Sequence, residues 1–217
     1  MAIPISEEFV EKYNQPGPRY TSYPTVPAWK QEFGENEYKA ALQDLAGRPD
    51  DEIAVYLHVP FCAKACHYCG CNMVVTHEKD EVTAYLDRLE REISMVTDII
   101  GKERRVVQMH WGGGTPNYLK DHQVERVLGM FREHFTIVPG AEVALEIDPR
   151  IASVEQVAFL RSAGFNRISL GVQDFEPRVQ TAIGRKQSRD KTLDVYHGCR
   201  DAGFEGVNLD LVYGLPG

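Results

Sequence analysis

No apolar run in the sequence is long enough to cross a membrane, and the N-terminal residues lack the basic segment and apolar core of a secretory signal. Positive charge is also scarce. The 24 Lys and Arg residues are scattered and are outnumbered by 32 Asp and Glu residues, which gives a formal net charge of -8. A nucleic-acid-binding surface needs clustered positive charge. We therefore expect a cytoplasmic protein without a nucleic-acid or membrane partner.

Cysteine is present in only five copies, and an odd number argues against a framework of disulfide bonds. Four of the five fall between Cys62 and Cys71, whereas Cys199 stands alone. In a reducing compartment, such crowding usually indicates metal or redox chemistry. The cysteine segment is therefore the first candidate for a functional site.

From residue 51 onward, short apolar runs alternate with segments of helical periodicity. Five strands are predicted, at residues 53–58, 106–111, 143–147, 167–172 and 207–213. This alternation is typical of an α/β fold with a parallel sheet. A closed eight-stranded barrel takes about 250 residues, but here the chain ends after the fifth strand. We expect a partial TIM-type (β/α) barrel, truncated after about five strands.

Residues 1–50 have a different character. The segment 16–27 contains four prolines and no periodicity, so it is expected to be extended or turning chain. A short amphipathic helix is predicted around Glu37–Leu45, followed by a linker at 47–50. We therefore predict an N-terminal arm with a short helix at 1–50 and the partial barrel at 51–217.

The cysteine segment lies directly after the first predicted strand, where parallel barrels place their chemistry. Cys62, Cys66 and Cys69 have the spacing Cys-x3-Cys-x2-Cys, which holds three thiolates on one tight loop. Cysteine thiolates ligate iron–sulfur clusters, and three ligands on a four-iron cluster leave one iron open. A structural zinc site completed by Cys71 or a nearby His is the alternative. Zinc modules usually supply ligands in two separated pairs, so the spacing favours the cluster.

The string Tyr-Leu-His-Val-Pro-Phe-Cys-Ala-Lys-Ala-Cys-His-Tyr-Cys-Gly-Cys at 56–71 resembles the radical-SAM superfamily. Together with Pro-Arg-Tyr-Thr-Ser-Tyr-Pro-Thr at 18–25, it resembles more narrowly the family of oxygen-independent coproporphyrinogen III oxidases. The resemblance extends from Pro16 to Gly217. Heme-binding or heme-chaperone paralogues share the cluster loop and are the alternative. They lack both the position of Cys71 and the segment 18–25.

The resemblance implies a [4Fe–4S] cluster on Cys62, Cys66 and Cys69, and two molecules of S-adenosyl-L-methionine. It implies that a 5′-deoxyadenosyl radical drives the oxidative decarboxylation of two propionates of coproporphyrinogen III to vinyl groups, which gives protoporphyrinogen IX in heme biosynthesis. A low-potential electron donor is expected, and the protein is expected to be a monomer. Family members are considerably longer, so we expect a missing C-terminal part, and the fragment itself is expected to lack full activity.

Further site residues are expected where the other strands end, because the carboxyl ends of parallel strands meet at one rim. Gly113, Gly114 and Thr115 follow the second strand, and glycines let a ligand approach the backbone closely. The resemblance assigns the amino-acid end of the first cofactor to this loop. Glu146 ends the third strand, where a carboxylate can accept hydrogen bonds from ribose hydroxyls. A solvent-facing acid is the alternative there.

The resemblance places the second S-adenosylmethionine against Gln173, Arg185 and Asp210. Asp210 lies within an apolar strand and needs a partner, because an unpaired buried charge is costly. A structural Asp–Arg pair would explain this residue equally well.

Three residues near the cysteine segment complete the predicted site. The resemblance gives Tyr56 a contact to the first cofactor and Tyr68 a contact to the second, whereas a core role is the alternative for Tyr56. Cys71 lies near the cluster without being a ligand, and either a catalytic role or a small buried thiol would explain it. Weaker candidates for contacts to substrate or cofactor are His58, Arg19 and Tyr20.

Overall fold

The computed structural model describes residues 5–14, 25–29 and 33–217. The chain divides into two units, Met1–Ala41 and Leu42–Gly217. The first contains α1 (Glu7–Tyr13), the 3-10 helix η1 (Val26–Ala28) and the start of α2 (Glu35–Ala46). Helix α2 confirms the predicted short helix. Most of the predicted extended segment 16–27, including Arg19 and Tyr20, lies outside the described residues.

The second unit is built on a parallel sheet in which the spatial order of the strands follows their order in the chain. Its strands are β1 (Ile53–Val59), β4 (Arg104–Gly113), β5 (Phe135–Ile147), β6 (Arg167–Gln173) and β7 (Gly206–Leu211). The sheet remains open, with β1 and β7 at its edges. The predicted parallel α/β class and the partial barrel are therefore confirmed.

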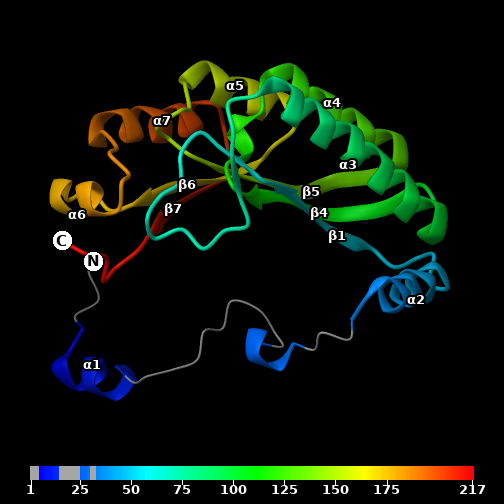
Figure 1. The fold of residues 1–217 in the computed structure, drawn as a ribbon, viewed down its shortest axis with the longest axis horizontal. Helices are drawn as coiled ribbons and strands as arrows, with labels where there is room; N and C mark the ends of the chain where they lie inside the picture. Colours follow the sequence, from blue (N-terminus) through cyan, green and yellow to red (C-terminus); the bar gives the residue numbers. More distant parts are fainter. Residues whose placement is uncertain (1–4, 15–24, 30–32) are drawn as a thin grey trace. The chain divides into compact units, whose positions relative to one another are not determined.

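Helices cover one face of this sheet, as Figure 1 shows. They are α3 (Lys79–Ile100), α4 (Asp121–His134), α5 (Val154–Ala163) and α7 (Arg189–Asp201), with the short α6 (Pro177–Ala182) between β6 and α7. The core lies between the two layers. Trp111 on β4 is fully buried, and its ring meets the edge of the Phe165 ring at a centroid distance of 5.1 Å. This packing fixes the ends of the strands, where the candidate site lies.

Two short strands that the sequence pattern does not reveal fix the base of the cysteine loop. They are β2 (Phe61–Cys62) and β3 (Val74–Val75), which pair with each other. The amide of Val74 donates to the carbonyl of Pro60 at 2.7 Å, and the amide of Thr76 donates to the carbonyl of Cys62 at 3.3 Å. Both ends of the loop between these strands are therefore held together by backbone hydrogen bonds. Within the described ranges, no helix is long and apolar enough to cross a lipid bilayer.

Candidate active site

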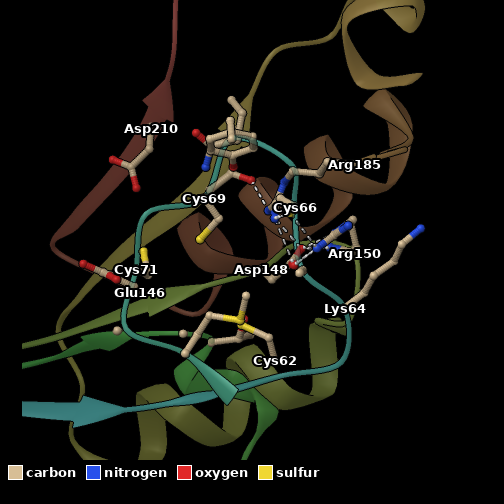
Figure 2. A pocket seen from close by; sticks show the side chains of 18 of the residues that line it. Cys62, Lys64, Cys66, Cys69, Cys71, Glu146, Asp148, Arg150, Arg185 and Asp210 are labelled. Carbon is tan, nitrogen blue, oxygen red and sulfur yellow. Dashed lines mark hydrogen bonds and ion pairs between the residues drawn. The ribbon is translucent and has the colours of Figure 1, made fainter. Parts of the chain in front are cut away.

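A cavity of about 320 Å³ lies where β4, β5, β6 and β7 end (Figure 2). Of the predicted site residues that the structure describes, all line it except Tyr56 and the weaker candidate His58. The lining also contains residues that were not predicted, of which Lys64, Asp148 and Arg150 carry charge. The topology therefore brings together side chains that are up to 148 positions apart in the sequence, from Cys62 to Asp210.

Four thiols of the cysteine loop reach this cavity. Cys62 is buried, and its sulfur lies 3.3 Å from the hydroxyl of Thr115, which belongs to the glycine-rich loop after β4. Cys66 and Cys69 are half-buried, and Cys71 is exposed. All five cysteines of the chain are free thiols. The loop thus presents reduced sulfur ligands to one hollow.

The donor set fits an iron–sulfur cluster, although its thiols are not yet in ligand geometry. Across residues 5–14, 25–29 and 33–217, no group of three or more His, Cys, Asp or Glu side chains is placed to hold a metal ion. Burial raises the pKa of Cys62, and burial together with the hydrogen bond to Cys69 raises the pKa of Cys71 to about 11. Metal ligation requires thiolates, so loading a cluster must release protons. Three thiols on one loop match the ligand type that such clusters require.

A buried ion-pair group lies behind Cys66. Asp148 binds the guanidinium of Arg150 at 2.6 Å and that of Arg185 at 3.1 Å. Burial alone would raise the pKa of Asp148, but the hydrogen bond from Arg150 and the charge of Arg185 outweigh it, and the pKa is lowered. Asp148 and Arg150 were missed as site residues. The signal was the Asp-Pro-Arg sequence directly after β5, at the same rim as Glu146.

The glycines after β4 are required by the protein's own packing. A side chain at Gly113, whose φ is +114°, would place its Cβ 2.7 Å from the ring of His58. At Gly114 the Cβ would lie 2.6 Å from the carbonyl oxygen of Pro60. These glycines let the loop lie directly against β1 and the start of the cysteine loop. They leave the hydroxyl of Thr115 beside Cys62.

Glu146 lies at the cavity with its carboxylate partly exposed. Its oxygen is 3.1 Å from the Nε2 atom of His110 on the neighbouring strand, and this hydrogen bond raises the pKa of His110. A Cβ at Gly112 would come within 3.0 Å of the carboxylate, so the glycine leaves room for it. Glu146 is therefore oriented by a histidine on one side and open to the cavity on the other.

Tyr56 does not line the cavity and is 58% exposed. Its ring stacks on His110 with a centroid distance of 6.0 Å, and its hydroxyl is 3.1 Å from Nδ1 of His58. The Nε2 atom of His58 lies 2.6 Å from the carbonyl of Asn72, at the end of the cysteine loop. Tyr56 is therefore connected to the cavity indirectly: it stacks on His110, and His110 is hydrogen-bonded to Glu146, which lines the cavity. Its exposure argues against the alternative of a core tyrosine.

The residues predicted for a second cofactor come from four separate segments. Asp210 accepts hydrogen bonds from Ser169 at 2.9 Å and from Asn208 at 2.7 Å, so these groups satisfy it in place of the Asp–Arg pair. Gln173 ends β6 with a positive φ of 68°, which is uncommon for a residue with a side chain. The Nε atom of Arg185 is buried and has no hydrogen-bond partner among the described residues. Tyr68 also lines the cavity, and burial raises its pKa to about 12.

Comparison with known proteins defines the class of this site. Residues 56–217 match the family model of the radical SAM superfamily, and the chain belongs to this superfamily. Membership implies an iron–sulfur cluster and S-adenosylmethionine as cofactors, and the donor set of the cysteine loop fits them.

Within the superfamily, the chain is similar to oxygen-independent coproporphyrinogen III oxidases. It is 43% identical over 207 residues to the enzyme of Escherichia coli (strain K12), with 95% of this chain and 44% of that protein covered. It is 41% identical over 214 residues to the enzyme of Synechocystis sp., with 99% and 46% covered. The solved structure of coproporphyrinogen III oxidase (HemN) from Escherichia coli matches with a TM-score of 0.84 and 41% identity, covering 95% of this chain and 45% of that chain. The chain thus spans less than half the length of these relatives.

Proposed function

We propose that this chain carries the cofactor-binding part of an oxygen-independent coproporphyrinogen III oxidase. The reaction is the oxidative decarboxylation of two propionate side chains of coproporphyrinogen III to vinyl groups, giving protoporphyrinogen IX in heme biosynthesis. The observation that carries the proposal is the cavity that unites the Cys-x3-Cys-x2-Cys thiols, the glycine-rich loop and Glu146. Relatives of this name align with 95% of the chain or more.

In this proposal, Cys62, Cys66 and Cys69 hold a [4Fe–4S] cluster. The loop at 113–115 holds the amino-acid end of S-adenosylmethionine, and Glu146 accepts from its ribose hydroxyls. When bound, these cofactors supply an electron and a 5′-deoxyadenosyl radical that removes hydrogen from a substrate propionate. The chain's own residues orient the cofactor and keep the reacting atoms away from solvent.

A second S-adenosylmethionine is proposed in the same cavity, against Tyr68, Gln173, Arg185 and Asp210. The support is that all four line the same hollow as the cysteine loop. Arg185 is a suitable contact for an anionic group because its charge is fixed and, within the part of the chain that the structure describes, its Nε atom has no hydrogen-bond partner. Tyr56 is proposed to contact the first cofactor at the side of His110.

Cys71 is proposed as a catalytic thiol that is not a cluster ligand. Its raised pKa of about 11 keeps it protonated at neutral pH, and it lies at the cavity surface. A low-potential electron donor is the expected protein partner, and the chain is proposed to act as a monomer. The cytoplasm is the proposed compartment, because a reducing environment preserves five free thiols.

Anaerobic reconstitution tests this function. The protein is expected to take up iron and sulfide, to cleave S-adenosylmethionine to 5′-deoxyadenosine, and to do so faster with coproporphyrinogen III. Cys66→Ala is expected to lose iron uptake. Cys199→Ala is the matched control, because Cys199 is fully buried on α7 outside the cavity.

Each alternative function has its own signature in the same experiment. Stoichiometric zinc without deoxyadenosine would show a structural zinc module. Tight heme binding with a reducible cluster but no vinyl products would show a heme-binding paralogue. Vinyl products, or substrate-dependent deoxyadenosine, would support the oxidase.

A further inference from the structure

Two guanidinium groups converge on the sulfur of one cysteine in the loop. The Nη2 atom of Arg150 lies 3.8 Å from Sγ of Cys66, and the Nη1 atom of Arg185 lies 3.7 Å from the same sulfur. Both distances fall within the range of a hydrogen bond to sulfur. The sulfur of Cys62, by contrast, contacts the neutral hydroxyl of Thr115. Positive charge is thus concentrated at one of the three proposed cluster ligands.

Buried contacts hold both arginines in place. Asp148, whose side chain is only 8% exposed, forms ion pairs with both guanidinium groups. The amide of Asp148 donates to the side chain of Asn117 at 2.9 Å, and Nη2 of Arg185 donates to the carbonyl of Gly171 at 2.6 Å. Lys191 also donates to the backbone carbonyl of Arg150. Turning either arginine away from Cys66 would break a buried ion pair, which is costly.

Arg150 is the member of this group that the proposed function leaves without a role. Its side chain is 21% exposed and lines the cavity next to Cys66. Figure 2 shows Arg150, Arg185 and Asp148 gathered close to Cys66, with dashed lines that mark the ion pairs of Asp148. Asp148 therefore holds the two arginine side chains beside the sulfur of Cys66 and not beside the carboxylate of Glu146.

We propose that Arg150, positioned by Asp148, donates a hydrogen bond to the sulfur of Cys66 and raises the reduction potential of the cluster that this thiolate ligates. The inference rests on the proposed function, since it requires a cluster on the cysteine loop. Reduction adds negative charge to the cluster and its sulfur ligands. A fixed cation with an N–H group at one sulfur stabilises the reduced form more than the oxidised form, and burial strengthens this effect.

The test is the midpoint potential of the reconstituted protein, measured by a redox titration followed by electron paramagnetic resonance without S-adenosylmethionine. Arg150→Gln is expected to lower the potential by the equivalent of at least a tenfold change in the reduction equilibrium, which is about 59 mV for one electron. Arg150→Lys keeps the positive charge, but an ammonium group lacks the planar guanidinium that can bind Asp148 and the sulfur at once. The midpoint potential of this variant is therefore expected to lie between those of Arg150→Gln and the wild-type protein. Arg200→Gln, at an exposed position on α7, is the control and keeps the wild-type potential.

The outcomes separate the inference from the proposed function. An unchanged potential in an Arg150→Gln protein that carries its cluster overturns the inference alone. So does an unchanged potential combined with weaker S-adenosylmethionine binding, which would make Arg150 a cofactor contact instead. If Arg150→Gln does not fold, Arg150→Lys decides, and a wild-type potential in that variant overturns the inference. If the wild-type protein takes up no cluster, the proposed function is wrong, and the inference that rests on it is wrong as well.

Discussion

The carboxylate of Asp148 holds in place the two arginine side chains, Arg150 and Arg185, that bring positive charge to the cavity. It pairs with the guanidinium groups of both Arg150 and Arg185, and its ionised form is favoured in the folded protein. Because its pKa is lowered on folding, the carboxylate contributes stability above its unfolded value of about 3.8. That contribution is lost as the pH falls through the lowered folded value.

Asp148→Asn is therefore expected to destabilise the protein at neutral pH, by about 3–5 kcal/mol, because it leaves the buried Arg185 and the partly buried Arg150 without their partner. The difference from wild type is expected to shrink as the pH falls from about 3.8 towards the lowered folded pKa of Asp148, because the unfolded wild-type chain takes up a proton there before the folded protein does. Urea unfolding at pH 7 and at successively lower pH measures both effects. Asp194→Asn, on the exposed face of α7, is the control. A destabilisation that does not vary with pH would contradict the ionic explanation.

The cysteine loop is an element that depends on a contact with a distant segment. The amide of His67 donates to the carbonyl of Ile183 at 2.9 Å, and its Nδ1 atom lies 2.9 Å from the carbonyl of Ala182. The His67 ring also packs against Gly184, where a Cβ would lie within 3.0 Å. The loop is thus fastened both at its base by β2 and β3 and at its tip by the segment after α6.

His67→Ala is expected to release the tip of the loop while its base stays paired. One hydrogen bond between side chain and carbonyl is lost, which costs about 0.5–1.5 kcal/mol, and the amide contact to Ile183 becomes easier to open. Hydrogen exchange of the amides in 63–73 is expected to accelerate, and iron uptake is expected to slow. His77→Ala, an exposed position beyond β3, serves for comparison. Unaltered exchange at His67→Ala would show that the backbone contact alone holds the loop.

The strands of the main sheet could be predicted because the burial of a strand determines which of its residues are apolar. The strands predicted at 53–58 and 167–172 match β1 and β6 closely, since both are short runs rich in Ile, Val and Leu in which more buried and more exposed residues alternate. The pair β2 and β3 was missed because two residues are too short to show periodicity. Helix α6 was also missed, because six residues with a leading proline resemble a turn.

The candidate site could be predicted only in part, and the reason is physical. Thiols, glycines and a strand-end acid stand out in a sequence, and those residues line the cavity. The pairing of Asp148 with Arg185 depends on a contact between the segment after β5 and the segment after α6, which no local spacing reveals, whereas its pairing with Arg150 is local. For the same reason, the stacking of Tyr56 on His110 required the register of β1 against β4.

The molecule as a whole has an open sheet, and its last strand is an edge. Within the described residues, β7 pairs only with β6. Leu209 and Leu211 on this strand are 43% and 67% exposed. An exposed apolar edge strand can pair with another copy of the same chain. The relatives are more than twice as long as the aligned region.

Leu211→Lys is expected to reduce self-association of the 217-residue chain, because a charge on an edge strand opposes edge-to-edge pairing. Analytical ultracentrifugation over a range of concentrations measures the fraction of larger species. Met95→Lys is the matched control, since Met95 is 64% exposed but lies on α3, away from any strand edge. If the two variants lower association equally, general surface hydrophobicity is the cause. If only Leu211→Lys does so, the edge of β7 is the surface through which copies of this chain associate.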